Sequence, residues 1–329
     1  MASAVALACS QFTGCAPGSS DIPTQNSREA PADAYIKGAL AYQQHDLDKA
    51  ILYLEQSLRS DPKNIMAHQT LGNIYRDKQD YPKALEHYRF VAEMDPYVYT
   101  NHYNVAITNH LLDHIREAVV SYLRALKLKP SDMRSNMNIG LAYASLGRAD
   151  LGVPYSQKAV EIDPKSPEAW GNLAVVLDEK HDYGAAEPAY QKALELDANR
   201  LDVARNFGAN LIAQGKGHQA TAVYEEILRK LDNTQIRERY GRALLLAERP
   251  EDAFKEFSSV FRREPRNLLA LNGMGDAMIG QYERSNQVDD AKRIAGLSYY
   301  RKSLSIKPVQ PRISEMVRRY EQGGILPHK

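Results

Sequence analysis

Histidine and glycine motifs are the first residues to test for catalysis or cofactor binding. His110 and His114 lie four residues apart, but "HLLDH" is not the metal-binding H-E-x-x-H, and we expect both to be exposed histidines near a helix end. "QGKG" at 214–217 resembles a phosphate loop, yet Asn210 stands where the first glycine is needed. "NGMGD" at 272–276 lacks the third glycine of a dinucleotide-binding loop. The sequence predicts no catalytic residue, no metal site and no cofactor.

Asparagine, in contrast, recurs at a fixed interval. Asn104, Asn138, Asn172 and Asn206 are each 34 residues apart, within the phrases "HYNVAI", "NMNIGLAY", "WGNLAVVL" and "ARNFGANL". An amide has two donors and a carbonyl acceptor, so a row of amides can hydrogen-bond the backbone of an extended peptide. The same amides could instead pack neighbouring helices together. The sequence leaves both interpretations open.

Repeated helices must position these amides. The segments "KAILYLEQSLRSDP", "KALEHYRFVAEMDP", "EAVVSYLRALKLKP" and "LGVPYSQKAVEIDP" end in prolines 34 residues apart. In "AWGNLAVVLDEK", which holds the only tryptophan, Trp170, Leu173, Ala174 and Leu177 form one apolar helical face. Asn172 lies on another face of that helix. Each repeat therefore contains helices that bury one face against a neighbour.

The period, the residue types and their order resemble the tetratricopeptide repeat family. The resemblance implies an all-α, right-handed solenoid of eight units, each a pair of antiparallel helices. Glycine at the eighth position (as in Gly72) and alanine at the twentieth (as in Ala84) would let the two helices approach closely. The expected units are 31–64, 65–98, 99–132, 133–166, 167–200, 201–233, 234–267 and 268–310, and residues 311–329 supply a capping helix and tail.

In this family the first helix of each unit lines a concave groove. The four asparagines then resemble the asparagine ladder in the repeat region of O-linked N-acetylglucosamine transferases. A clamp for a C-terminal carboxylate would use Gln69, Asn73, Asn104, Arg134 and Asn138, but Gln69 and Asn138 stand where the clamp has charged residues, so a weaker polar anchor is expected. Further along, Asp202, Arg205, Glu238, Arg239 and Arg242 give the groove mixed charge, which could select partners or remain solvated.

Composition limits the partners. The net charge is +1, so nothing favours nucleic acid or an anionic membrane, and no apolar run is long enough for a membrane span. Both cysteines, Cys9 and Cys15, precede the repeats, which excludes a disulfide framework or a thiolate metal site in the body. We expect a protein or peptide partner.

The first thirty residues differ from the repeats. "FTGC", ending at Cys15, resembles the lipobox of bacterial lipoproteins, and residues 16–30 would then form a flexible tether. The basic start of a signal peptide is missing before Arg28, so we expect Met1 to lie inside a longer signal sequence. A cytoplasmic protein is the alternative. A lipid anchor at Cys15 would place the chain at the cell envelope, facing the periplasm.

The expected function is non-catalytic: a scaffold that holds a partner segment in the groove. With the lipobox, the chain resembles envelope lipoproteins that assist assembly of Flp/Tad-type or type IV pili. One alternative is a subunit that recruits substrates for a separate glycosyltransferase or peptidase. Another is a cytoplasmic chaperone adaptor that binds free C-terminal carboxylates.

Overall fold

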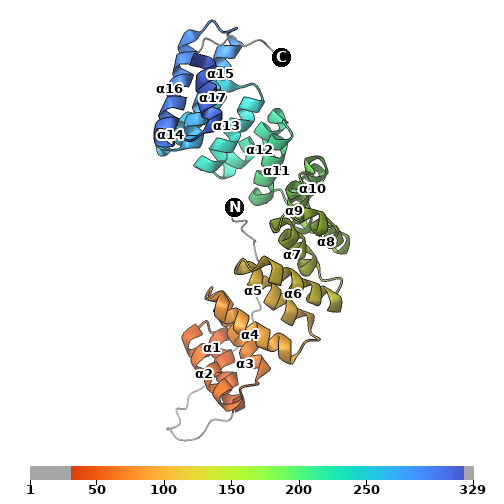
Figure 1. The fold of residues 1–329 in the computed structure, drawn as a ribbon. Helices are drawn as coiled ribbons and strands as arrows, with labels where there is room; N and C mark the ends of the chain where they lie inside the picture. The colour runs from red at the N-terminus through yellow and green to blue at the C-terminus, as the bar shows by residue number, and fades with distance from the viewer. Residues whose placement is uncertain (1–30, 322–329) are drawn as a thin grey trace. The chain divides into compact units, whose positions relative to one another are not determined.

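The computed structural model describes residues 31–321 as seventeen α-helices, with no strand among these residues (Figure 1). The predicted all-α fold is therefore confirmed. The helices are α1 (Pro31–Gln43), α2 (Leu47–Ser60), α3 (Ile65–Asp77), α4 (Tyr81–Met94), α5 (Tyr99–Leu111), α6 (Ile115–Leu128), α7 (Met133–Ser145), α8 (Ala149–Ile162), α9 (Pro167–Glu179), α10 (Tyr183–Leu196), α11 (Leu201–Ala213), α12 (Gly217–Lys230), α13 (Thr234–Leu246), α14 (Pro250–Arg263), α15 (Leu268–Arg284), α16 (Asp290–Ile306) and α17 (Pro311–Glu321). The lipobox-like segment with Cys15 and the last eight residues lie outside the described residues.

The chain divides into two compact units, one ending at Ala67 and the other beginning at His68, so the division falls within α3. The first unit is built around the packing of α1 on α2. Its closest approach is at Gly38, where an added Cβ would lie 2.7 Å from Cγ of Leu54. A larger residue at position 38 would force these helices apart.

In the second unit each odd-numbered helix from α5 onward packs against the even-numbered helix that follows it. The odd-numbered helices also contact one another in series, from α5 and α7 through α13 and α15. The odd-numbered helices therefore form one continuous layer. We call the surface that this layer carries from α5 to α15 the odd-helix face.

In several helix pairs, close approach depends on a glycine that faces a large side chain sixteen residues later. A Cβ on Gly72 would lie 2.7 Å from the Tyr88 ring, and a Cβ on Gly208 would lie 2.6 Å from the Tyr224 ring. Both tyrosine rings are almost fully buried. The glycine thus makes room for an aromatic ring that fills the space between the two helices, as the sequence predicted.

The turns inside the pairs share one backbone feature. A residue with positive φ occurs every 34 residues, at His45, Gln79, Asp113, Gly147, His181 and Gly215, with φ between 60° and 73°. Only two of these residues are glycine, which adopts this conformation without steric cost. The other four are held in the left-handed region by the helices on either side of the turn.

Side-chain caps fix where many helices begin. The residue before the helix accepts a hydrogen bond from the backbone three residues later at Asp46, Asp80, Asp132, Ser166, Asp182, Asn233, Asn267 and Asp289. These bonds satisfy backbone donors that have no partner inside the helix.

Successive repeats are also connected by side chains at the fourth position of the odd-numbered helices. His102, Asn136 and Trp170 each donate a side-chain N–H to a proline carbonyl six residues earlier, over 2.8, 3.0 and 2.9 Å. The acceptors are Pro96, Pro130 and Pro164, the prolines that end the preceding helices. The lone tryptophan therefore has a polar role that its apolar spacing did not reveal.

The C-terminal end departs from the repeat. Helices α15 and α16 each have 17 residues, whereas α5 to α14 have 13 or 14. Helix α17 packs on α16 (Figure 1). Its Ile313 and Tyr320 side chains are buried. It covers an apolar helix surface that would otherwise face water, as expected for a cap.

Candidate peptide-binding surface

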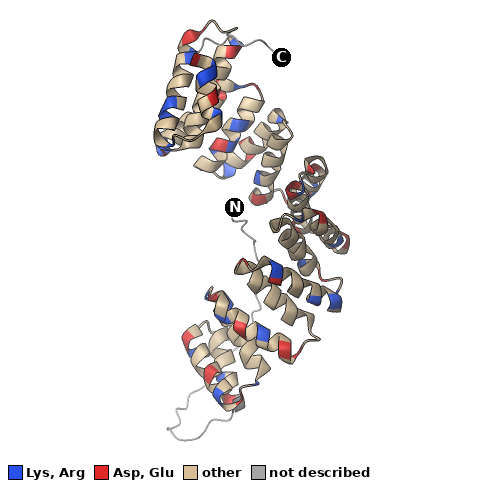
Figure 2. Cartoon of the chain, viewed as in Figure 1, with Lys and Arg blue, Asp and Glu red and all other residues tan. Residues whose placement is uncertain are grey.

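The odd-helix face has two parts with different side chains. The amide section carries Asn104 on α5, Asn138 on α7 and Asn172 on α9. The arginine section carries Arg205 on α11, together with Arg239 and Arg242 on α13, and continues to α15. Figure 2 shows Lys and Arg interspersed with Asp and Glu along the chain, so the difference between the sections does not come from a block of one charge.

Asn172 is occupied by contacts within the protein. Its side chain is 6% exposed. Ser156 Oγ on α8 donates to Asn172 Oδ1 over 2.9 Å, and Asn172 Nδ2 donates to the carbonyl of Met137 on α7 over 3.0 Å. A buried amide with both ends bonded holds three helices together. Asn172 therefore supports helix packing.

Asn138 is also mostly buried, and it donates through Nδ2 to the Tyr103 hydroxyl over 3.3 Å. Arg134 lies above the same ring, with its guanidinium carbon 6.0 Å from the ring centroid. Burial raises the pKa of Tyr103, and Arg134 acts in the opposite direction. The structure thus brings Arg134 and Asn138 together around one tyrosine, while Arg134 remains exposed.

Asn104 and Asn206 differ from the other two asparagines. Both are partly exposed, and neither side chain forms a hydrogen bond within residues 31–321. Their amides can therefore bond a partner without breaking an internal contact. The four equivalent positions divide into two buried structural amides and two open ones.

The proposed carboxylate anchor is only partly assembled. Asn73 Oδ1 accepts a hydrogen bond from the Tyr88 hydroxyl over 2.7 Å and one from Gln69 Nε2 over 3.4 Å. Burial raises the pKa of Tyr88 to about 12, so its hydroxyl remains a donor at neutral pH. Asn73 and Gln69 thus bond to groups within the protein, which leaves Arg134 as the charged member of the set.

The arginine section surrounds the hydroxyl of Tyr224, whose ring is buried between α11 and α12. That hydroxyl lies 3.4 Å from the Arg205 carbonyl. Burial raises the pKa of Tyr224, whereas the nearby guanidinium groups of Arg239, Arg205 and Arg242 lower it. The three arginines are therefore gathered around one fixed point. None of them forms an ion pair within the described part of the chain.

The acidic residues expected to balance these arginines are engaged elsewhere. Asp202 is paired with Arg200 through two bonds of 2.8 and 3.0 Å. Glu238 accepts a hydrogen bond from Asn267 Nδ2 over 2.6 Å. Asp202 is therefore neutralised by Arg200, whereas Glu238 bonds a neutral amide and keeps its charge, so the section retains mixed charge with three arginines that have no carboxylate partner among the described residues.

A pocket of about 310 Å³ lies next to Arg242, between α13 and α15. Its lining combines Leu245, Leu269 and Phe257 with polar groups. Asn272 Nδ2 donates to Gln310 Oε1, but its Oδ1 is buried and has no hydrogen-bond partner among residues 31–321. The sequence singles out Asn272 only within "NGMGD", and the one signal that Asn272 shares with Leu245 and Leu269 is that all three fall at groove-facing positions of the repeat.

Asp276 and Arg312 close the other side of this pocket. They form a two-bond ion pair of 3.0 Å per bond, and the Tyr300 hydroxyl donates to the same carboxylate over 2.6 Å. These charges offset each other. Two cations, Arg242 and Arg312, line the pocket. Of these, only Arg242 has no carboxylate partner among the described residues.

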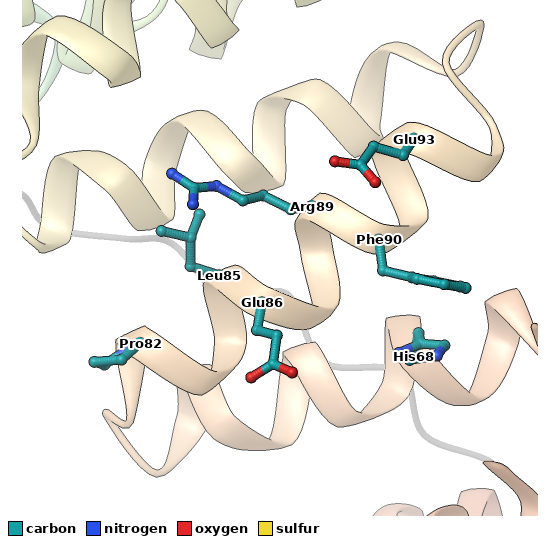
Figure 3. A pocket seen from close by; sticks show the side chains of 7 residues that line it. All are labelled: His68, Pro82, Leu85, Glu86, Arg89, Phe90 and Glu93. Atoms are coloured by element: carbon teal, nitrogen blue, oxygen red, sulfur yellow. The ribbon is translucent and has the colours of Figure 1, made fainter. Parts of the chain in front are cut away.

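A second cavity, of about 380 Å³, lies against α4 rather than on the odd-helix face (Figure 3). At one end Phe90 stacks on His68, with ring centroids 3.9 Å apart. His68 Nδ1 is also 2.8 Å from His87 Nδ1, and burial lowers the pKa of His87 to about 4. His68 and His87 therefore pack as aromatic rings and share one hydrogen bond.

The two histidines of "HLLDH" do not form a metal site. His114 precedes α6, whereas His110 lies in α5 with a buried, unpartnered Nδ1, so the expectation that both are exposed was wrong for His110. Across residues 31–321 no three His, Cys, Asp or Glu side chains gather as metal ligands. None of these helices is both long and apolar enough to cross a membrane.

Family models and known proteins agree with the architecture. Models of the tetratricopeptide repeat match residues 35–99, 134–166 and 167–200. A solved tetratricopeptide repeat protein from Parabacteroides merdae shares the fold, with a TM-score of 0.59 and 18% identity over 75% of this chain and 98% of that one.

Two curated relatives differ widely in biology. BBSome complex member BBS4 of Bos taurus is 27% identical over 57% of this chain and 43% of its own length. Type IV pilus assembly protein PilF of Pseudomonas aeruginosa is 29% identical over 45% of this chain and 60% of its own length. This chain spans less than two thirds of either relative. The repeat matches and the paired helices identify it as a tetratricopeptide repeat protein.

Proposed function

We propose that the chain is a non-catalytic scaffold that holds a segment of a partner protein against the odd-helix face. The observation that carries the proposal is that Asn104 and Asn206 stay partly exposed, with no side-chain hydrogen bond to any of residues 31–321. Unpaired amides on a rigid helical layer can bond the backbone of an extended segment.

The proposed contact residues are Asn104, Arg134, Asn206 and the arginine section. Asn172 is left out because its amide already bonds Ser156 and Met137. Asn138 contributes by fixing Tyr103 beneath Arg134. The surface is thus a set of separate polar anchors along the helices.

We further propose a place in envelope or type IV pilus assembly, with a lipid anchor at Cys15. The likeness to PilF supports this, together with the lipobox-like "FTGC". Palmitate labelling that disappears in Cys15→Ala is the expected result. Unlabelled protein expressed from its full gene in the native host would contradict the anchor and leave the scaffold proposal standing.

Site-specific photocrosslinking tests the scaffold. A photoreactive residue at position 104 is expected to capture a partner, whereas the same residue at exposed Lys127 on α6 is not. The captured protein is then purified and its binding measured. Asn104→Ala with Asn206→Ala should weaken that binding about tenfold and leave the melting temperature unchanged.

The same measurements separate the alternatives. Equal capture from positions 104 and 127, or unchanged binding by the double variant, would contradict a partner site on the odd-helix face. Capture of a catalytic subunit would instead identify the chain as the recruiting subunit of an enzyme.

A further inference from the structure

We infer that the arginine section binds an acidic segment of a partner protein, with carboxylates at Arg205, Arg239 and Arg242 and an apolar side chain in the adjoining pocket. The inference rests on the proposed function and names the chemistry of the partner at this part of the surface. It concerns internal Asp and Glu side chains rather than a free C-terminus.

The arginine section differs from neighbouring arginines in its ion pairing. The nearby arginines Arg200 and Arg237 each hold carboxylates of this chain, at 2.8 and 2.7 Å. Arg205, Arg239 and Arg242 lie on the same two helices, and none is ion-paired in residues 31–321. Guanidinium groups form their strongest hydrogen bonds with carboxylates, often two at a time. Three unpaired guanidinium groups in one place therefore favour an acidic ligand.

Helix packing supports the arginine section. The side chains extend from α11 and α13, which contact each other, and between them lies the fixed ring of Tyr224. A Cβ on Gly208 would lie 2.6 Å from that ring, so the ring has no room to move toward α11. The packed helices therefore fix where the three arginines are attached, so binding does not require this backbone to be ordered.

The pocket beside Arg242 offers an apolar contact. It begins at Arg242, has an apolar lining from Leu245, Leu269 and Phe257, and has a volume of about 310 Å³. An acidic segment with one leucine-sized side chain matches both features, the arginines without carboxylate partners and the apolar lining.

The test uses a defined probe. It is a fluorescein-labelled, C-terminally amidated peptide, Gly-Ser-Glu-Glu-Leu-Glu-Gly-Ser, whose binding to the full chain is followed by fluorescence anisotropy. We expect the glutamine version, in which every Glu is replaced, to bind at least about tenfold more weakly. Raising the salt concentration should weaken the Glu peptide and leave the Gln peptide unchanged. Replacing the peptide's leucine by serine should also weaken binding.

Protein variants locate the site. Arg205→Gln with Arg242→Gln should weaken the Glu peptide about tenfold, since both side chains are exposed and the fold should not change. The matched control is Arg229→Gln, an exposed arginine of α12 that is paired with Glu226 at 2.8 Å. Leu269→Ser tests the pocket and should weaken only the leucine-containing peptide.

Three results would overturn the inference. They are equal binding of the Glu and Gln peptides, full binding by the double arginine variant, and equally tight binding of a Gln peptide with a free C-terminal carboxylate. The last result would assign the site to chain ends. Each of them leaves the crosslinking test at position 104 untouched, so failure of this inference can be distinguished from failure of the scaffold proposal.

Discussion

The amide section and the arginine section lie on one layer of helices but use their polar side chains in opposite ways. In the amide section Asn138 and Asn172 bond to neighbouring helices. In the arginine section Arg205, Arg239 and Arg242 have no carboxylate partner within the described residues. The amides of the first section stabilise helix packing, whereas the arginines of the second section can still bind carboxylates. Position in a repeat therefore does not determine whether a side chain serves the fold or a partner.

The reason lies in the residues that face each position. Asn172 can accept from Ser156 because the 24th position of that repeat is a small serine. The equivalent residue before Asn206 is Tyr190, whose longer side chain reaches Asp178 instead, at 2.6 Å. The residue on the even-numbered helix therefore decides only whether the asparagine can bond that helix, since Asn138, which follows Tyr122, bonds Tyr103 on α5 instead.

The largest effect is expected at Gly152, where α7 and α8 of the amide section approach most closely. A Cβ there would lie 2.5 Å from the backbone carbonyl of Gly140, which cannot move aside as a side chain can. Gly152→Ala should lower the free energy of unfolding by about 3 kcal/mol in urea denaturation. The control is Gly184→Ala on α10, where no atom lies within 4 Å and the helix should gain slightly. Equal results for both would show that the close approach is unimportant.

Asn172→Ala and Asn206→Ala compare a bonded asparagine with an open one. Asn172→Ala leaves Ser156 and the Met137 carbonyl without their partner, so the free energy of unfolding should fall by about 2 kcal/mol. Asn206→Ala breaks no side-chain hydrogen bond seen in the described part of the chain and should change the free energy of unfolding by less than about 0.5 kcal/mol. Thermal melting measures both, and a large loss at Asn206 would remove the distinction between bonded and open positions.

Two buried tyrosines at the 24th position should respond with opposite signs. Tyr190 donates to Asp178, so Tyr190→Phe should destabilise the protein by about 1.5 kcal/mol. The Tyr122 hydroxyl is buried and has no hydrogen-bond partner in the region that the structure describes, so Tyr122→Phe should be neutral or stabilising by about 1 kcal/mol. Urea denaturation of the two variants measures the contrast. Loss of stability in Tyr122→Phe would mean that this hydroxyl has a donor or acceptor in solution.

Acid should lower the stability of the fold through His87, a histidine of α4 that lies outside both sections. Burial, with a smaller contribution from His68, lowers the pKa of His87 from 6.5 to about 4. Between these values the unfolded chain binds a proton that the native His87 does not, so stability falls as pH falls from 6.5 to 4. After allowance for solvent screening, we expect a loss of about 1 kcal/mol between pH 7 and pH 5.

Urea titrations at the two pH values check this loss. His87→Gln should remove it, whereas His218→Gln, at an exposed position on α12, should not. Peptide binding at the arginine section should hardly change over the same range, because arginine stays charged. A pH effect that persists in His87→Gln would place the acid-sensitive group elsewhere.

Much of the fold follows from local patterns in the sequence. The 34-residue period, the spacing of glycine and alanine and the prolines after most pairs predict an all-α repeat, and the structure confirms it. The site was harder to predict. The sequence points to the asparagines and arginines, but it does not show which are bonded, because their partners lie up to 35 residues away, on other helices.

By itself the sequence determined that the chain forms repeated helix pairs, because helical periodicity and close-packing positions are local properties read every few residues. Only the tertiary structure decided that Asn172 supports packing, that Asp202 and Glu238 are partnered, and that Asn272 Oδ1 is not. Hydrogen bonding and ion pairing depend on distances of about 3 Å between side chains on different helices. Those distances exist only once the helices have packed.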